Sequence, residues 1–79
     1  MLSDVPFESL CVWDVVISVI GTPGKITDLI PIETATRKED NEIIIQWNNG
    51  KFSMIWHFEG SKILYDELST LIVKNTDQP

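Results

Sequence analysis

The sequence predicts an all-β fold, a small and strongly bent barrel of five to six short antiparallel strands. The apolar stretches are short and rich in Val and Ile, which pack well on pleated sheets. Turn residues separate these stretches, and Asn49-Gly50 marks a tight hairpin in the middle of the chain. The length of 79 residues suits one domain with a small core, in which hairpins must pack on one another to be stable.

The whole chain, residues 1–79, is expected to form this single domain. We expect the barrel at about 10–74, with flexible segments at 1–6 and 75–79, because chain ends with few contacts fray. No internal repeat or low-complexity segment divides the chain.

The first strand is expected at Leu10–Ile20, which reads LCVWDVVISVI. Alternate residues would form one strongly apolar side of this strand: Trp13, Val15, Ile17 and Val19. Asp14 would then lie on the opposite, outer side. Cys11 lies in the apolar run, so we expect it to be a buried and unreactive thiol.

A turn and a second strand are expected to follow. The GTPG sequence at 21–24 has the pattern of a type II turn, because Pro23 presets φ and Gly24 accepts a positive φ. The strand is expected at Lys25–Glu33. Four of its residues share one face: Ile26, Asp28, Ile30 and Ile32. Pro31 cannot donate to a ladder, so it marks a sheet edge or a bulge.

A polar loop at Thr34–Glu42 leads into the clearest feature, a hairpin at Glu42–Phe58. Asn49-Gly50 predicts a two-residue type I′ turn, which needs positive φ at both central residues. This turn sets Trp47 opposite Phe52 and Glu42 opposite His57. Six apolar side chains would then form one continuous core face: Ile43, Ile45, Trp47, Phe52, Met54 and Trp56.

The chain after the hairpin is less regular. Glu59–Ser61 is a short break, expected as a single 3₁₀ turn. Lys62–Tyr65 is expected to form a further strand. The segment 66–74 fits either a helix or a strand, and its β-branched residues favour a strand at about 69–74.

The charge balance disfavours direct binding to nucleic acid. Twelve Asp and Glu stand against six Lys and Arg, a formal net charge of −6, and the basic residues are scattered. Neutralising phosphates needs clustered Lys and Arg. An acidic surface points instead to a basic protein partner, or to solubility alone.

Cysteine content and the N-terminal sequence predict a cytoplasmic protein without membrane contact. Cys11 is the only cysteine, so neither an intramolecular disulfide nor a cysteine-based zinc site can form within the chain. The start of the chain is acidic rather than basic, unlike a signal peptide, and the Leu10–Ile20 run is too short to span a bilayer.

Candidate catalytic chemistry centres on His57, the only histidine. A catalytic triad would need a nucleophile and an acid beside it, whereas its expected neighbour Glu42 forms an ordinary cross-strand charge pair. One histidine is too few ligands for a typical zinc site, and GTPG lacks the spacing of a phosphate loop. We therefore expect no catalytic residue, cofactor or metal.

The order of elements resembles an SH3-like barrel of the Tudor or KOW type over about residues 10–65. The resemblance lies in the first strand with GTPGKI, in the central IIIQWNNGKFSMIWHF hairpin, and in the short break before KILY. The pattern, with its WNNGK turn, is also similar to uncharacterised small phage-type proteins. The resemblance implies binding of peptides, methylated side chains or nucleic acid, and Tudor-like domains hold a methylated cation in an aromatic cage.

Together these features predict a non-enzymatic acidic binding module that contacts a basic protein partner. A phage-type modulator or inhibitor of a host nucleic-acid-associated protein is one form of this expectation. Exposed strand edges also allow a homodimer. The candidate partner-binding residues combine acidic groups with side chains near strand ends: Glu39, Asp40, Glu42, His57, Phe58, Glu59, Tyr65, Asp66 and Glu67.

Two alternatives stay open. The first is a Tudor- or KOW-like nucleic-acid-binding module. It requires four cations to converge despite the overall charge: Arg37, Lys38, Lys51 and Lys62. The second is a DNA mimic, which requires the acidic residues to gather on one face.

Overall fold

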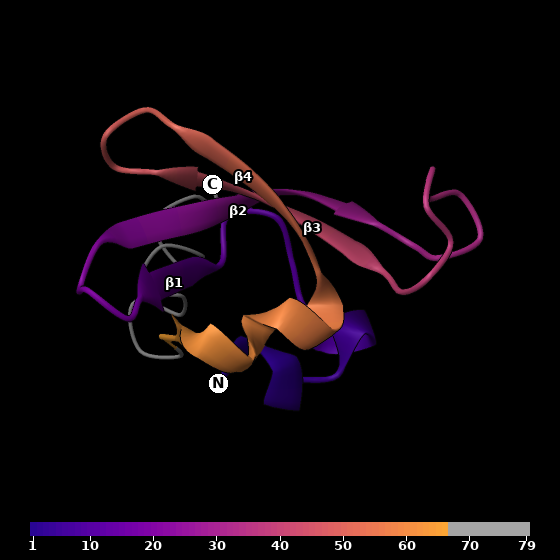
Figure 1. Ribbon diagram of the computed structural model, residues 1–79. Coiled ribbons are helices and arrows are strands. Elements are labelled where there is room, and N and C mark those ends of the chain that lie inside the picture. The colour runs from indigo at the N-terminus through magenta and orange to yellow at the C-terminus, as the bar shows by residue number, and fades with distance from the viewer. Residues whose placement is uncertain (67–79) are drawn as a thin grey trace, which may run out of the picture.

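The structure is a computed structural model of the chain, and it describes residues 1–66. Five strands form one antiparallel sheet in the order β4-β3-β2-β1-β5, which curls strongly into a half-barrel (Figure 1). The strands are β1 (Val15–Ser18), β2 (Pro23–Ile30), β3 (Glu42–Trp47), β4 (Phe52–Trp56) and β5 (Ile63–Tyr65). The predicted all-β class is confirmed, and the half-barrel is consistent with an SH3-like fold.

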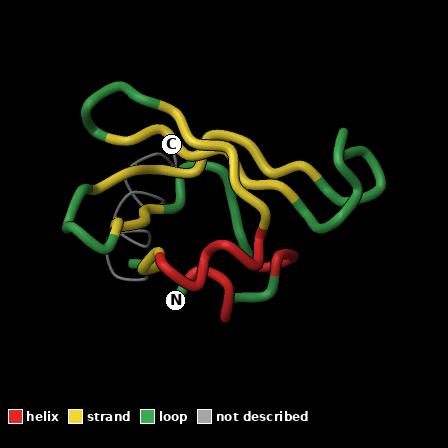
Figure 2. The backbone as a smooth tube through the Cα atoms, in the orientation of Figure 1, coloured by secondary structure: helices red, strands yellow, loops and turns green. Residues whose placement is uncertain are grey.

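Three short 3₁₀ helices lie together beneath the sheet (Figure 2). They are η1 (Leu2–Asp4), η2 (Phe7–Ser9) and η3 (His57–Lys62). The predicted 3₁₀ turn at Glu59–Ser61 is therefore confirmed, within a longer element. Among residues 1–66, no helix combines the length and the apolar character needed to cross a membrane.

The core lies on the inner face of the sheet and is closed from below by the N-terminal segment. Its buried side chains come from four strands and from the N-terminal residues: Leu2, Leu10, Val16, Ile26, Ile43, Ile45 and Ile63. Leu2 belongs to the segment 1–6 that was expected to be flexible, yet it is fully buried. His57 Nε2 also lies 2.8 Å from the carbonyl oxygen of Val5, so this segment packs on η3. The structure therefore places residues 1–6 within the fold.

The first strand is shorter than predicted because a turn occupies Cys11–Asp14. The Asp14 N–H donates to the Cys11 carbonyl at 3.1 Å, and Trp13 has a φ of 79°, as the third residue of a type II turn requires. The Trp13 N–H donates to the Ile26 carbonyl, and the Ile26 N–H donates to the Asp14 carbonyl. Trp13 and Asp14 therefore both lie opposite Ile26, which is a β-bulge. The prediction of a strand from Leu10 was wrong.

This turn reverses the expected sides of the first strand. Trp13 is 46% exposed, with the Lys25 ammonium 4.4 Å from its ring centroid, and Cys11 is also exposed. Asp14 and Val16 are instead fully buried. The predicted core position of Trp13, the buried thiol of Cys11 and the outer position of Asp14 were all wrong.

The turn between β1 and β2 lies at Ser18–Gly21 rather than at 21–24. The Gly21 N–H donates to the Ser18 carbonyl at 2.9 Å, and the positive φ falls on Gly21. Pro23 and Gly24 already belong to β2. The predicted turn at 21–24 was wrong because the nearby Gly21, rather than Gly24, adopts the left-handed conformation.

A bulge in β2 changes which residues of this strand face the core. The pairing with β3 shifts between Ile26 and Asp28, so Thr27 is the extra residue. Ile26 and Leu29 therefore both pack inward, whereas Asp28 is exposed and accepts the Leu29 N–H at 2.9 Å. The expected shared face of Ile26 and Asp28 was wrong. Pro31 follows the end of β2, which is a central strand and not an edge.

The central hairpin is present, but its register differs by one residue from the prediction. The Trp47 N–H donates to the Lys51 carbonyl at 2.8 Å, so the two residues form the last pair and the loop 48–50 has three residues. Gly50 has positive φ whereas Asn49 does not, which excludes a type I′ turn and matches a type I turn with a glycine bulge. Consequently Ile55, not Met54, shares the inner face with Ile43 and Ile45.

The changed register moves half of the expected core face outward. Phe52 is 62% exposed and Met54 is 54% exposed, and both lie on the outer face of β4. Trp56 is half-buried on the same face. The predicted strand at Lys62–Tyr65 is confirmed as β5, which pairs with β1. The predicted strand at 69–74 lies outside the described residues.

Gly24 is required by the close approach of Trp47. A Cβ atom on Gly24 would lie 2.6 Å from Cε3 of the Trp47 ring and 3.0 Å from Cγ2 of Ile45. Gly24→Ala is therefore expected to lower the free energy of unfolding by about 1–3 kcal/mol, the range for an overpacked core. Urea unfolding followed by circular dichroism measures it. The same change in a Trp47→Leu background should cost much less, and an equal cost in both backgrounds would contradict this explanation.

Candidate binding site

The residues predicted to bind a partner gather mainly where β3 begins and β4 ends. The loop 31–41 joins β2 to β3 there, and two of its residues fix it in place. Asn41 accepts the Ile32 N–H through Oδ1 and the His57 N–H through its carbonyl, both at 2.8 Å. Asp40 Oδ2 accepts the Phe58 N–H at 2.9 Å. The loop is thereby tied both to the end of β2 and to η3.

Two stacked aromatic rings form the centre of this end of the sheet. The ring centroids of Trp56 and Phe58 are 5.6 Å apart with an interplanar angle of 19°, and Phe58 is 56% exposed. The guanidinium carbon of Arg37 lies 4.0 Å from the Trp56 ring centroid, which is a cation–π contact. We call Arg37, Asp40, Trp56, Phe58 and Glu59 the Trp56 site.

Carboxylates support the backbone that carries these rings. Glu59 Oε1 accepts the Trp56 N–H at 2.8 Å, as Asp40 does for Phe58. Glu59 is exposed, and so is Glu39, which directly precedes Asp40. The Trp56 site thus combines aromatic faces with negative charge, the two features that attract an organic cation.

Glu42 does not lie on this surface. It is only 2% exposed and pairs across the ladder with Trp56, not with His57 as predicted. Its Oε1 and the Trp56 Nε1 are buried without a hydrogen-bond partner in the described part of the chain. His57 instead contacts Val5 and packs edge-on against Phe7, so the predicted Glu42–His57 charge pair was wrong.

The remaining predicted residues lie elsewhere. The Tyr65 hydroxyl donates to Asp14 Oδ2 at 2.9 Å, and the Asp66 N–H donates to the Val15 carbonyl at 3.1 Å. Both residues therefore belong to the β1–β5 side of the sheet. Glu67 lies outside the described residues. Of the nine predicted residues, the structure brings Asp40, Phe58 and Glu59 together at the Trp56 site, and the exposed Glu39 directly precedes Asp40.

The four cations required by the nucleic-acid alternative do not form one cluster. Arg37 and Lys38 lie in the loop before β3, whereas Lys51 lies at the turn that joins β3 to β4. Figure 1 shows this loop and this turn at opposite ends of the hairpin. Lys62 ends η3. A continuous phosphate track through all four cations is therefore not formed.

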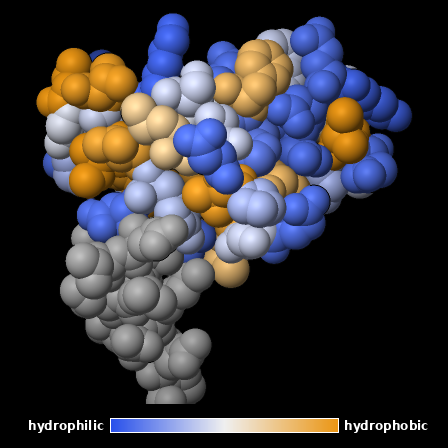
Figure 3. Space-filling view, turned by 90° about the horizontal axis from the view of Figure 1, so that it is seen from below, coloured by the Kyte–Doolittle hydropathy of each residue, from blue (hydrophilic) through white to orange (hydrophobic). Residues whose placement is uncertain are grey.

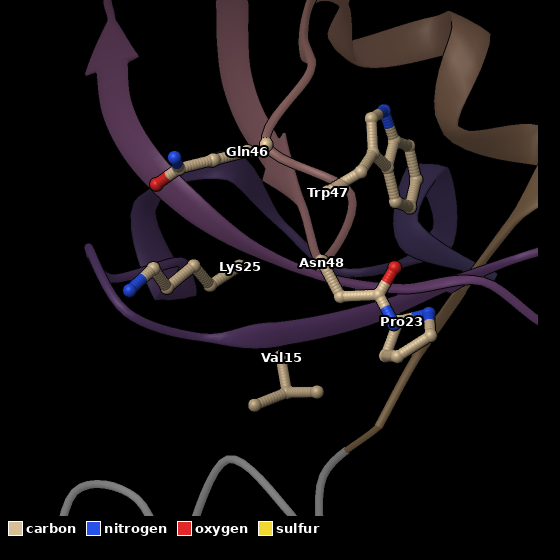
Figure 4. Close-up of a pocket in the computed structure, with 8 residues that line it drawn as sticks. Val15, Pro23, Lys25, Gln46, Trp47 and Asn48 are labelled. Carbon is tan, nitrogen blue, oxygen red and sulfur yellow. The ribbon is translucent and has the colours of Figure 1, made fainter.

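A second surface, at the turn end of the hairpin, was missed by the sequence analysis. A shallow hollow of about 460 Å³ lies there, and Figure 4 shows Lys25, Gln46, Trp47 and Asn48 around it, with Val15 below them. A neighbouring hollow of about 360 Å³ includes Val19 and Ile20 of the β1–β2 turn.

The second surface is apolar at its edge, and none of its described lining residues is acidic. Ile20 is 85% exposed, and Figure 3 shows apolar side chains gathered on the side where the β1–β2 turn lies. Among residues 1–66, neither hollow is lined by a carboxylate, histidine or cysteine, so these residues do not bring together the groups of a hydrolytic site there. No signal in the sequence marked this surface, because Trp47 was assigned wholly to the core.

No group of three or more potential metal ligands occurs among residues 1–66. Comparisons with protein-family models, with curated proteins and with solved structures find no match to this chain. The geometry of the Trp56 site and the charge of the chain are therefore the basis for a functional proposal.

Proposed function

We propose that the protein is a non-enzymatic, Tudor-like binding module that takes a basic segment of a protein partner at the Trp56 site. The observation that carries this proposal is the intramolecular contact between Arg37 and Trp56. The ring already accepts a guanidinium group, so a cation of a partner would find the same chemistry there.

The surroundings of the ring favour exchange of one cation for another. Arg37 is exposed and lies in a loop, so releasing it buries no charge and disrupts no strand. An exposed cation–π contact is worth only about 0.5–1 kcal/mol, which an incoming cation can readily match. The carboxylates of Asp40 and Glu59 would add charge-assisted contacts to an incoming Lys or Arg.

The charge of the whole chain supports the same class of partner. A net charge of −6 attracts basic surfaces and repels acidic ones, such as a nucleic acid. Proteins that bind nucleic acid carry such basic surfaces, so we propose a nucleic-acid-associated protein as the partner. If the chain is phage-encoded, a modulator or inhibitor of such a host protein fits this proposal.

Peptide titrations followed by NMR test the proposal. Arg- and Lys-rich peptides should shift the Trp56 indole and Phe58 amide signals, and binding should weaken as salt is added. Phe58→Ala and Asp40→Asn should each weaken binding about 2- to 5-fold, the size expected for one exposed cation–π or charged contact.

The control for these variants is Ile20→Ser, which changes an exposed apolar residue at the other end of the sheet. It should leave peptide binding unchanged. Equal binding of an acidic peptide of the same length, or unchanged binding by Phe58→Ala, would contradict the proposal.

A further inference from the structure

β4 is an edge strand of the sheet in the described part of the chain, and it carries exposed apolar side chains. The order β4-β3-β2-β1-β5 leaves one side of β4 without a neighbouring strand. Phe52 and Met54 are the two exposed side chains of β4. An unpaired strand edge that carries apolar side chains is a surface on which another strand can pair.

The register of the hairpin shows which backbone groups face outward. At the turn, Trp47 and Lys51 form a hydrogen-bonded pair. At the far end of the hairpin, the His57 N–H donates to the Asn41 carbonyl, so these two residues also form a hydrogen-bonded pair. Bonded and non-bonded pairs alternate along an antiparallel ladder, so Phe52, Met54 and Trp56 lie at non-bonded positions. The N–H and C=O groups of these three residues therefore point away from β3.

The open edge has defined limits. The Trp56 N–H is already occupied by Glu59 Oε1 at 2.8 Å. At the other end, the Gly50 N–H bonds to Trp47 within the turn. No other residue among 1–66 bonds to the outward backbone groups of Phe52 and Met54. Two donors and two acceptors remain, and the Phe52–Trp56 strand holds neither a proline nor a charged residue that would block pairing.

We propose that a second copy of this chain pairs with this edge, β4 against β4, antiparallel about a two-fold axis at Ser53. Phe52 of one copy then lies opposite Met54 of the other, and each of these two pairs forms two hydrogen bonds. All four outward groups of each copy are used. Each pair also sets a phenyl ring beside a thioether on the outer face, which is a favourable sulfur–aromatic contact.

Other registers use fewer of these groups. Centring the pair on Met54 sets Phe52 opposite Trp56, whose N–H is already bonded to Glu59. Centring the pair on Phe52 sets Met54 opposite Gly50. Gly50 cannot join a strand ladder there, because its φ is positive and its N–H already donates to the Trp47 carbonyl. The register about Ser53 is therefore the one that satisfies both copies.

A local pairing of opposite charges favours a second copy in this orientation. Gly50 of one copy lies opposite Trp56 of the other, so Lys51 comes beside the Glu59 carboxylate that caps Trp56 there. The two-fold axis makes this contact twice. Elsewhere an acidic chain of net charge −6 repels its own copy, whereas the Phe52–Trp56 strand has no charge to oppose association.

Hydrogen exchange at two protein concentrations tests the dimer directly. At about 10 μM the Phe52 and Met54 amides should exchange rapidly, and at about 1 mM, a range in which weak interfaces associate, they should become protected. Sedimentation should show the mass rising toward twice that of the chain over the same range. Rapid exchange of both amides at the higher concentration would overturn the proposal.

A matched pair of variants locates the interface. Met54→Lys places two like charges near each other across the two-fold axis and should abolish dimerisation. Because Met54 is exposed, the monomer should stay folded, as circular dichroism would show. Ile20→Lys adds the same charge at the most exposed large apolar residue among residues 1–66 and should leave the dimer intact. A dimer that survives Met54→Lys, or one that Ile20→Lys destroys, would overturn the β4 assignment.

This inference does not rest on the proposed function. Met54 lies outside the Trp56 site, so Met54→Lys should retain binding of basic peptides even as it loses the dimer. Failure of peptide binding in the unaltered chain would leave the dimer test unaffected, and the two proposals can therefore fail separately.

Discussion

Asp14→Ala is expected to lower the free energy of unfolding by about 3 kcal/mol, because hydrogen bonds to a charged acceptor are worth about 1.5–3 kcal/mol each. Asp14 is fully buried, and its Oδ2 accepts the Cys11 N–H at 2.8 Å and the Tyr65 hydroxyl at 2.9 Å. These bonds join the turn before β1 to β5, so their loss affects two elements distant in sequence. Urea unfolding followed by circular dichroism measures the change.

Two variants separate this role from a general effect of removing a carboxylate. Asp28→Ala removes an exposed side chain that, among residues 1–66, accepts only the neighbouring Leu29 N–H, and should cost less than about 0.5 kcal/mol. Tyr65→Phe removes one of the bonds to Asp14 that the structure describes and should cost about 1.5–3 kcal/mol. A cost for Asp14→Ala no larger than that for Asp28→Ala would show that the buried carboxylate does not hold the turn to β5.

Ile45→Ala is expected to cost about 2–5 kcal/mol, the range for truncating a fully buried isoleucine. Ile45 has no exposed surface and lies between Ile26 of β2 and Ser53 of β4 on the inner face. Its loss would leave a cavity where three strands meet the core. Denaturant unfolding gives this value directly.

Met54→Ala is the matched control because the two-residue turn would have placed Met54 opposite Ile45 in the core. In the observed register Met54 is exposed, and its truncation should change stability by about 0.5 kcal/mol or less in the monomer. The measurement belongs at a low protein concentration, where the proposed dimer does not contribute. Comparable losses at Ile45 and Met54 would contradict the three-residue loop.

The location of the hairpin was predictable, whereas its register was not. Asn49-Gly50 marks the turn in either case, because both turn types need a residue with positive φ and Gly50 supplies it. They differ in whether Asn49 also has positive φ, and that depends on packing. The run Ile43-Ile44-Ile45 offers apolar side chains to both faces, so the hydrophobic pattern accepts either register.

Bulges explain the other errors in assigning faces. A single extra residue, Thr27, lets Ile26 and Leu29 both face the core, which strict alternation forbids. The bulge at Trp13 and Asp14 has the same effect before β1. Trp13 holds a backbone conformation that glycine usually adopts, so local preference gave no indication of it.

The Trp56 site was partly predictable. Asp40, Phe58 and Glu59 were chosen for charge and for position near strand ends, and the structure brings them together. Arg37 was considered only as a loop cation, because its contact with Trp56 depends on how the loop 31–41 folds back. Glu42 was chosen as a surface acid, yet the ladder with Trp56 buries it.

Local sequence was sufficient to locate the β-structure and to define the acidic character of the surface. Strand propensity, turn residues and net charge are properties of short segments or of simple sums, and they need no long-range contact. Long-range packing selected the register of the hairpin, the burial of Asp14 and the pairing of Arg37 with Trp56. Each of these depends on atoms far apart in the chain, where a shift of one residue exchanges the inner and outer faces.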